Sequence, residues 1–521
     1  MNDKNTKNMI KNKFQLKNEK LIFLLIPIGI ISYLIRSYYF EPEVALTFDS
    51  LGYFFYSVDI MVLGHLPEDY TLANTLWPIF LSIFFPFFQF ENTIQYMDLQ
   101  KNLAIILSTI TIIPIYFLCR KFFESKIALV GAIIFGLEPR LIQNSMIGIT
   151  ESLYILLGTI TLVLFLSSNK KLVYLSFMFA AFTTLTRSEG QMIFLIISIM
   201  FFVRYRKEKL IIPKYFIALS IFLIIISPMM IHQSTILEND SIFGKAANTI
   251  TYHTKDPNET GGESGLPFFV NGIENFSKFF LWDLIPIFIF FVPIGIFYLF
   301  KNIDFKKLSL ILWGFVISIP AFYAYSIPLQ DTRFLFMLYP IFCVISLFFI
   351  EKFSNKYKRK NLLIILVIIG ISFSSIVFLE TKPSDNLQKY ESYQIAKDIV
   401  REHKIINSFY PEDNFLEPAA YPEKWNDFKK LFLLEREQGK SIRNSILNPI
   451  IIIPTNGYIS IEEFIKQNNE LTHIYVDQNE NRPQFLKKIY QNENQYEFLI
   501  KEYDSKDFGY NYHVKIFRII K

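Results

Sequence analysis

Long apolar segments follow one another through the first 380 residues of this chain. Runs such as LIFLLIPIGIISYLI, FLIIISPMMI and LLIILVIIGISF are long enough to form most of a bilayer crossing, which takes roughly 20 residues. Of the 521 residues, 52% are hydrophobic and 19% are charged, a balance that is too apolar for a typical soluble chain. The pattern predicts an α-helical membrane protein with many crossings.

Basic clusters separate the apolar segments and predict the orientation of the chain. Because Lys and Arg favour the cytoplasmic side, all clusters are expected there, and two crossings must separate each from the next. The clusters lie at Lys4–Lys20, Arg120–Lys126, Lys170–Lys171, Arg204–Lys209, Lys301–Lys307 and Lys352–Lys360. About eleven spans satisfy this condition and give a cytoplasmic N-terminal tail, 1–20, and a C-terminal region outside. We predict spans at about 21–39, 100–119, 127–145, 150–168, 171–186, 190–204, 211–231, 282–300, 308–327, 334–352 and 361–380.

The apolar segment 75–90 is not counted among these spans. It contains two prolines and has no basic flank, and counting it would move every later basic cluster to the outer face. We therefore expect a helix that lies at the outer membrane surface. The membrane domain, 21–380, then carries two large outer loops, 40–99 and 232–281.

The C-terminal region, 381–521, has a different character. It is charged and alternates helical stretches (ESYQIAKDIVREH, IEEFIKQNNE) with short β-like runs (PIIIIP, LTHIYVD, HVKIFRII). This alternation predicts a small α/β domain outside the cytoplasm. The chain has only two cysteines, both in apolar runs, and a net charge of +5 that is explained by membrane orientation, so neither disulfides nor nucleic-acid binding is expected.

Acidic residues in the first outer loop supply candidates for acid–base chemistry. The stretch TFDSLGYFFY places Asp49 near the membrane beside Tyr53 and other aromatic residues, where a carboxylate can act as a general base. Alternatively, Asp49 and Ser50 only begin the helix that follows, as an N-cap. Asp59, within that helix, is interpreted as a solvent-facing residue or as the partner of a cation.

Basic residues at the predicted outer ends of spans are exceptions to the positive-inside rule. An anionic partner at the outer surface, such as a lipid phosphate, would explain them, because Arg binds phosphate through two parallel hydrogen bonds. For Arg36 and Lys101 we favour a simpler interpretation, in which the side chains reach the lipid headgroups. Arg187 and Arg333 each have a neighbouring acid, Glu189 and Asp331 respectively. The residues assigned to the phosphate are Arg333, Arg187, Arg140 and Lys101.

The polar segment 138–151 joins the third and fourth predicted spans. It contains Glu138, Arg140 and Glu151, and polar backbone at membrane depth is tolerated where it lines a cavity. We therefore expect Glu138 and Glu151, with Glu189 and Asp331, to line the site, together with Tyr53 and Asp59 of the first outer loop. The residues present suggest no metal ligand set, although a divalent Mg or Mn ion is left open as a cofactor.

These motifs, in this order, resemble those of the GT-C superfamily of polyprenyl-phosphate-sugar-dependent glycosyltransferases, and most closely glycosyltransferase family 39, which includes the protein mannosyltransferases and the RgtA/B/C/D-like proteins. The resemblance extends from the first span to about residue 350. It rests on Asp49, Ser50, Tyr53 and Gly64, and on TLWPIFLSIFF, EPRLIQNSMIGITESLYILL, TRSEG and DTRFLFMLYP. Many family members have Glu where this chain has Ser50. The chain also lacks the WWDxG motif of the oligosaccharyltransferase branch.

The resemblance implies a cytoplasmic N-terminus and an essential aspartate in the first outer loop, which would be Asp49. It also implies transfer of a sugar from a dolichyl or undecaprenyl phosphate to an acceptor hydroxyl on the outer side of the cell membrane, with inversion. The acceptor can be a protein, a lipid or a glycan. Two other classes are left open: a transporter or flippase of lipids or sugars, and a non-catalytic membrane scaffold that binds glycans or lipids.

Overall fold

The computed structural model describes most of the chain between residues 20 and 520. The gaps are 69, 73, 237–265, 328–330, 382–383, 403–407, 410–414, 439–459, 468–471 and 479–482. The predicted N-terminal tail up to residue 19, most of the loop 232–281 and the run PIIIIP therefore lie outside the described residues. The chain forms two compact units. Unit 1 comprises residues 1–40, 67–78 and 101–381, and unit 2 comprises residues 41–66, 79–100 and 382–521.

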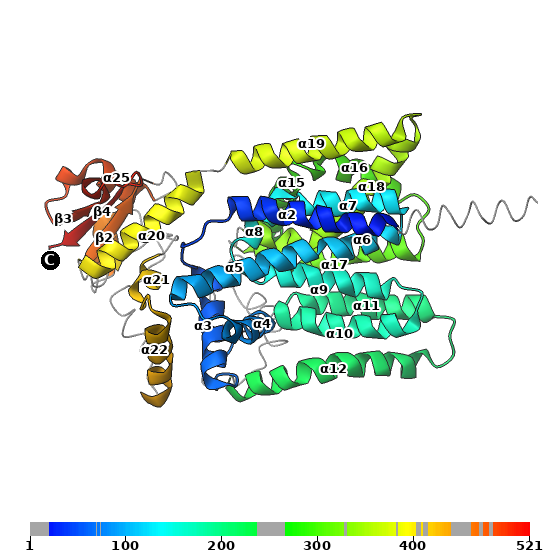
Figure 1. Cartoon of the computed structure of the whole chain (residues 1–521), viewed down its shortest axis with the longest axis horizontal. Coiled ribbons are helices and arrows are strands. Elements are labelled where there is room, and N and C mark those ends of the chain that lie inside the picture. The colour runs from blue at the N-terminus through cyan, green and yellow to red at the C-terminus, as the bar shows by residue number, and fades with distance from the viewer. Residues whose placement is uncertain are drawn as a thin grey trace, which may run out of the picture. The chain divides into compact units, whose positions relative to one another are not determined.

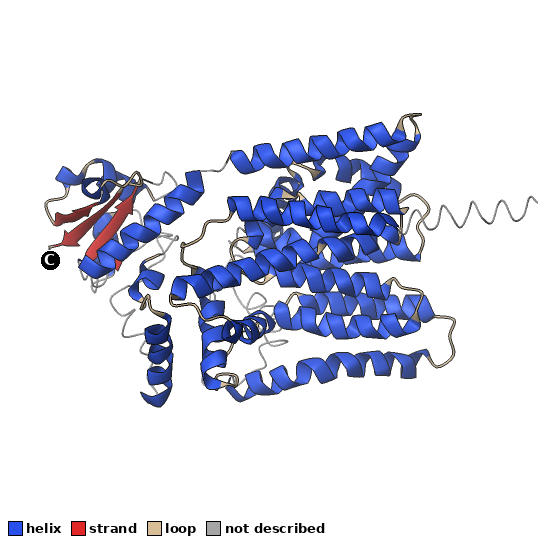
Figure 2. Ribbon diagram, viewed as in Figure 1, coloured by secondary structure: helices blue, strands red, loops and turns tan. Residues whose placement is uncertain are grey.

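Unit 1 consists of helices, most of which run side by side (Figures 1 and 2). Its elements are η1 (Lys20–Leu24), α2 (Leu25–Tyr39), α6 (Ile112–Arg120), α7 (Ser125–Gly136), α8 (Pro139–Ser145), α9 (Glu151–Phe165), α10 (Lys170–Thr186), α11 (Gly190–Tyr205), α12 (Ile211–Ile236), α15 (Leu266–Leu284), α16 (Phe288–Leu299), α17 (Phe305–Ser326), η3 (Thr332–Leu338), α18 (Tyr339–Asn355) and α19 (Lys360–Glu380). α4 (Leu76–Phe84) and α5 (Thr93–Ile110) contain residues of both units.

The apolar segments of the sequence coincide with these helices. Within the described residues, six helices are long and apolar enough to cross a membrane, or seven if the bent pair α15 and α16 is one span. Shorter apolar helices at 125–136, 151–165 and 190–205 coincide with three more predicted spans. The prediction of a multi-pass helical membrane protein is confirmed, whereas the number of eleven spans stays a prediction. α4 has nine residues, fewer than a crossing requires.

Burial differs strongly among the long helices. Of the most apolar window in 332–355, which includes α18, 78% is buried inside the protein, against 17% in α19 and 22% in α12. α12 and α19 lie at opposite edges of unit 1 in Figure 1. Since all these helices are apolar all round, the buried one forms the centre of the bundle, and the edge helices have apolar faces suited to lipid.

Arg36 of α2 is fully buried, which contradicts the prediction that it reaches the lipid headgroups. Its Nη1 donates to the carbonyl of Gly136 at 3.0 Å and to Ser32 Oγ at 2.5 Å, and its Nη2 donates to Ser108 Oγ at 3.1 Å. Gly136 is the last residue of α7, so its carbonyl has no acceptor role inside the helix. Arg36 therefore ties three helices together, because an arginine inside the bundle is tolerated only with such partners.

Unit 2 contains a four-stranded sheet, which confirms the predicted C-terminal α/β region. The strand order is β1 (Ser408–Phe409), β2 (His473–Asp477), β4 (Val514–Ile519), β3 (Leu499–Asp504), with β1 parallel to β2 and the other pairs antiparallel. β2 and β4 are the predicted runs LTHIYVD and HVKIFRII. The helices of unit 2 are α3 (Phe48–Leu63), α20 (Ser384–Glu402), α21 (Leu416–Ala420), α22 (Trp425–Gln438), α24 (Ile461–Gln467) and α25 (Gln484–Gln491). Apolar residues of α24, α25 and the sheet form its core.

The first outer loop and the C-terminal region pack together inside unit 2. Phe54 and Phe55 of α3 contact Phe428 of α22, with ring centroids 5.8 and 6.2 Å apart. Beside them, the amide of Thr93 donates to the carbonyl of Glu423 at 2.8 Å, within a short antiparallel bridge. Loop 40–99, predicted as part of the membrane domain, thus contributes α3 and the segment 79–100 to the same compact unit as the C-terminal region.

Candidate functional site

Arg187 stands in the break between α10 and α11 of unit 1. α10 ends at Thr186, and α11 begins at Gly190, so the segment RSE is a sharp turn in which Arg187 has an extended backbone. Its guanidinium donates from Nη2 to Glu189 Oε1 at 2.8 Å and from Nε to Glu189 Oε2 at 3.3 Å. Its Nη1 pairs with Glu151, the first residue of α9. The guanidinium also lies 5.9 Å from the ring centroid of Tyr154.

Glu151 links Arg187 to Arg333. The Glu151 side chain is 2% exposed, and its Oε1 lies 3.9 Å from Arg333 Nη1. Arg333, in η3, donates from Nε to Asp331 Oδ2 at 2.5 Å, while the other Asp331 oxygen accepts the amide of Arg333 at 2.9 Å. Glu151 is thus the buried acid between two arginines, each of which also holds a more exposed acid from its own segment.

The charges of this group nearly balance. Two arginines face three carboxylates, so the sum is one negative charge when all are ionised. The exposed fraction is 24% for Glu189 and 32% for Asp331 and for Arg333. The cavity lined by Tyr154, Arg187, Glu189 and Arg333 is about 10 Å³, room for roughly one water molecule. An anion can bind here only if the two exposed carboxylates turn away from the arginines.

Arg140 of α8 belongs to a second buried cluster. Its Nη2 donates to the carbonyl of Trp282 at 2.8 Å, and its Nε donates to the carbonyl of Ile285 at 3.2 Å. Nε also lies 3.9 Å from Asp283 Oδ1. These carbonyls belong to the end of α15, where a cation is favoured by the helix dipole. This geometry favours a structural role for Arg140, at the bend between α15 and α16, over the predicted phosphate contact.

Glu138 and Asp283 are the fully buried acids of that second cluster. Glu138 begins α8 as its N-cap, with Oε1 accepting the amide of Arg140 at 3.4 Å. The charged residues of the segment 138–151 therefore lie in two different clusters. Arg140 contacts the end of α15 and Glu138 contacts Arg140, whereas Glu151 pairs with Arg187. Lys101 is also buried, at 5% exposure, and its Nζ lies 5.5 Å from the ring centroid of Phe40. This burial contradicts the prediction that its side chain reaches the lipid headgroups.

Asp49 lies in the first turn of α3 in unit 2, and its side chain is exposed. The N-cap is Thr47, so the N-cap interpretation of Asp49 is wrong. Tyr53, one turn further along, is half-buried, and its carbonyl accepts from Ser57 Oγ at 2.6 Å. Asp59 is 1% exposed, which contradicts its interpretation as a solvent-facing residue.

Sequence reasoning missed two residues of these clusters. Asp283 was included in a predicted span without a role, although an acid at the edge of an apolar run, here in LWDLIP, is itself a signal. Tyr154 lies in the apolar run of α9, where nothing marks it out. Within the described residues, no group of three or more His, Cys, Asp or Glu side chains is arranged to hold a metal ion.

Comparisons with known proteins concern the fold of the chain and one segment of it. Residues 79–232 match the family model of dolichyl-phosphate-mannose-protein mannosyltransferases. Oligosaccharyltransferase AglB from Archaeoglobus fulgidus, solved with an inhibitory peptide and a dolichol-phosphate, superposes with a TM-score of 0.52 and 13% identity over 87% of this chain and 69% of AglB. ArnT from Cupriavidus metallidurans, bound to undecaprenyl phosphate, gives 0.55 and 9% identity over 95% and 97%. No curated protein sequence matches. The solved structures share the fold, and the matched segment contains Glu151, Arg187 and Glu189.

Proposed function

We propose that this chain, which is a membrane glycosyltransferase of the GT-C superfamily, transfers one sugar from a polyprenyl phosphate to an acceptor hydroxyl outside the cytoplasm, with inversion at the anomeric carbon. We call Glu151, Arg187, Glu189, Asp331 and Arg333 the Arg187 cluster. The observation that carries this proposal is the match of residues 79–232 to the mannosyltransferase family, because that segment contains Glu151, Arg187 and Glu189 of this cluster. AglB and ArnT, which share the fold, were solved with a dolichol-phosphate and with undecaprenyl phosphate. The family match favours a transferase over a transporter or a scaffold.

Arg187 and Arg333 bind the donor phosphate in this proposal. An arginine can bind a phosphate through two parallel hydrogen bonds. Three guanidinium nitrogens of Arg187 and one of Arg333 now donate to carboxylates. Glu189 and Asp331 are exposed enough to turn away, whereas the buried Glu151 stays and holds both arginines at a fixed separation. As the bond to the sugar breaks, charge grows on the phosphate oxygen, and the arginines stabilise it.

Asp49 accepts the proton of the acceptor hydroxyl. Its side chain is exposed and can reach a substrate, and a carboxylate can act as a general base toward a hydroxyl group. The hydroxyl oxygen attacks the anomeric carbon, the bond to the phosphate oxygen breaks, and the proton passes to Asp49. The polyprenyl phosphate leaves as the anion.

The test is transfer of radiolabelled sugar from a polyprenyl phosphate by membranes that contain the full chain. Asp49→Asn is expected to abolish transfer while the protein still inserts into the membrane, and Glu91→Gln, an exposed acid of the same loop, serves as its control. Arg333→Ala is expected to raise the KM for the donor without a comparable rise in the KM for the acceptor. Near-normal turnover by Asp49→Asn would remove it as the base. Extraction of label into protein, lipid and glycan fractions identifies the acceptor class.

We also propose that the N-terminus faces the cytoplasm and the C-terminal α/β region faces outward, as the distribution of basic clusters predicts. A protease cleavage site added after residue 521 is expected to be cut in intact cells. Protection of that site in intact cells, with cleavage in inverted vesicles, would reverse the orientation.

A further inference from the structure

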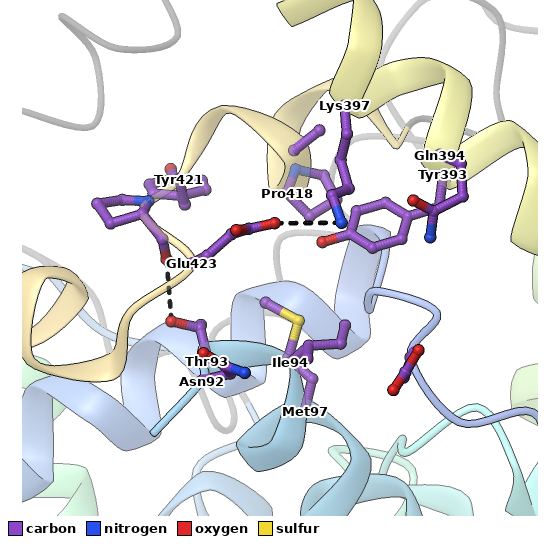
Figure 3. Close-up of a pocket in the computed structure, with 13 residues that line it drawn as sticks. Asn92, Thr93, Ile94, Met97, Tyr393, Gln394, Lys397, Pro418, Tyr421 and Glu423 are labelled. Carbon is purple, nitrogen blue, oxygen red and sulfur yellow. Dashed lines mark hydrogen bonds and ion pairs between the residues drawn. The ribbon is translucent and has the colours of Figure 1, made fainter. Parts of the chain in front are cut away.

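Unit 2 contains a cavity of about 210 Å³ that the proposed reaction does not use. Figure 3 shows its walls: Tyr393, Gln394 and Lys397 come from α20, Ile94 and Met97 from the first turns of α5, and Glu423 from the loop after α21. All of these residues belong to unit 2. The cavity is smaller than the roughly 300–1,000 Å³ of pockets that take drug-sized ligands, so it suits a single ring.

The walls of this cavity are held rigidly. The amide and the hydroxyl of Thr93 donate to the carbonyls of Glu423 and Pro422, at 2.8 and 3.0 Å, and the amide of Trp425 donates to the carbonyl of Glu91 at 2.8 Å. Across the cavity, Lys397 Nζ lies 3.1 Å from Glu423 Oε1 and 5.3 Å from the ring centroid of Tyr393. Figure 3 draws the ion pair between Lys397 and Glu423 and the hydrogen bond from the Thr93 hydroxyl to the Pro422 carbonyl. A cavity with fixed walls binds a ligand without the cost of ordering them.

The charges of the lining disfavour an anion. Glu43 and Glu423 are negative, and Lys397 is the cation that lines the cavity, so the sum is one negative charge. A phosphate group would have to displace Glu423 from Lys397 and would still face Glu43. The formal charge of the Arg187 cluster is the same, but that cluster offers a phosphate two guanidinium groups, whereas the lining of this cavity offers one ammonium group.

The lining contains both polar groups and apolar side chains. A sugar ring can use both, because its hydroxyl groups form hydrogen bonds and its C–H face packs on apolar surface. Gln394 and Asn92 each offer an amide donor and acceptor, and the carboxylates accept from hydroxyl groups. Ile94, Met97 and the ring of Tyr393 provide apolar surface for the C–H face of a ring. An extended peptide would need a groove, whereas this cavity accommodates one compact group.

From these observations we infer that the cavity binds one uncharged sugar ring of a glycan acceptor. That the bound sugar belongs to the acceptor rests on the proposed transferase function, because a transferase that extends a glycan must hold its acceptor chain. The binding itself does not depend on turnover. It positions the acceptor through a sugar unit that does not react.

The experiment measures binding without turnover. The full chain, solubilised in detergent, is mixed with the methyl glycosides of mannose, glucose, galactose and N-acetylglucosamine, and saturation-transfer NMR detects which of them binds. At least one glycoside is expected to bind. Gln394→Ala and Lys397→Ala are each expected to weaken this binding about 10-fold, the loss expected for one or two good hydrogen bonds. Lys389→Ala, an exposed lysine of the same helix, is the matched control and is expected to change nothing.

A second measurement does not rely on weakened binding. Cys119 and Cys343 are fully buried, so iodoacetamide reports mainly on a new cysteine in Gln394→Cys. At a glycoside concentration raised about 10-fold, which offsets the loss of the Gln394 amide, the bound glycoside is expected to slow alkylation at position 394. Alkylation of Lys389→Cys is expected to be unaffected. Asp49→Asn, inactive under the proposed function, is expected to bind the glycoside normally, so failure of the reaction and failure of this site are distinguishable. The inference is overturned if no glycoside binds, if Gln394→Ala binds normally, or if inorganic phosphate or an acceptor peptide protects position 394 instead.

Discussion

Replacing Glu189 by Gln tests whether the exposed carboxylates of the Arg187 cluster occupy the place of the donor phosphate. Gln keeps the side-chain shape and one acceptor oxygen, so the change removes the charge and one of the two hydrogen bonds to Arg187. Glu189 binds Arg187 through two hydrogen bonds, at 2.8 and 3.3 Å, and the two side chains are 24% and 13% exposed. Exposed ion pairs contribute about 0.2–1 kcal/mol, and loss of a partner from a buried pair costs about 3–5 kcal/mol. Arg187 and Glu189 are mostly buried, but Arg187 still pairs with Glu151 after the substitution. We therefore expect the lost interaction to be worth about 1–2 kcal/mol.

The free energy lost from this ion pair should lower the stability of the protein and strengthen the binding of the donor. Unfolding should become easier by about 1–2 kcal/mol, because Arg187 loses one of its two acids. Donor binding should become tighter by roughly 5- to 30-fold, because the phosphate no longer competes with that acid and about 1.4 kcal/mol corresponds to tenfold. The assays are thermal unfolding in detergent, and the KM of the donor together with inhibition of transfer by free polyprenyl phosphate.

The control is Glu208→Gln in the connection between α11 and α12. Glu208 pairs with Lys170 at 2.7 Å and with Lys214 at 2.5 Å, so it is another paired acid of unit 1, but outside the Arg187 cluster. Donor binding should not change in this variant. If Glu189→Gln lowers stability and weakens donor binding, Glu189 contributes to the donor site directly and the competition argument is refuted.

Three further substitutions test the fold. Arg140→Met should lower the free energy of unfolding by about 3 kcal/mol, because it leaves the end of α15 and a buried acid without their cation; a change below about 1 kcal/mol would contradict that structural role. Gly190→Ala should lower the unfolding temperature, since its Cβ would lie 2.6 Å from the backbone of α10, whereas Gly370→Ala, with open space around it, should not; equal effects would refute the close approach. A hydrogen bond from Lys515 lowers the pKa of Glu493, so its contribution to stability is present above the pKa it has when unfolded and is lost as pH falls through the folded value. The stability difference between the native chain and Glu493→Gln should therefore shrink as pH falls below the unfolded pKa of Glu, about 4.3, and be lost once pH is below the folded pKa. A difference that does not shrink with falling pH would count against this coupling.

The sequence alone predicts the parts of the fold that depend on local composition. Apolar segments and basic clusters are read directly, because the bilayer imposes them residue by residue. The pairs Arg187–Glu189 and Arg333–Asp331 are also visible, since their members are two residues apart. The break between α7 and α8 is less visible: the predicted span 127–145 is interrupted where Glu138 begins a new helix before Pro139.

Contacts between distant segments could not be predicted. Glu151 meets Arg187 from 36 residues away, and Arg140 meets Asp283 only because α8 packs against the end of α15. Position relative to a span also does not determine burial. Arg36 at a predicted outer end is fully buried because Ser32, Ser108 and the end of α7 supply its acceptors, and no single-sequence pattern announces such partners.

The assembly of unit 2 from separate segments has a consequence for synthesis in the cell. Residues 41–66 and 79–100 leave the ribosome about 280 residues before the segment 382–521 that completes the unit. At roughly 5–20 residues per second, this interval lasts roughly 15–60 s. During that time Phe54 and Phe55 have no α22 to cover them. The nascent chain must therefore shield this aromatic surface in another way, by the membrane surface or by a chaperone, until the segment 382–521 has been synthesised.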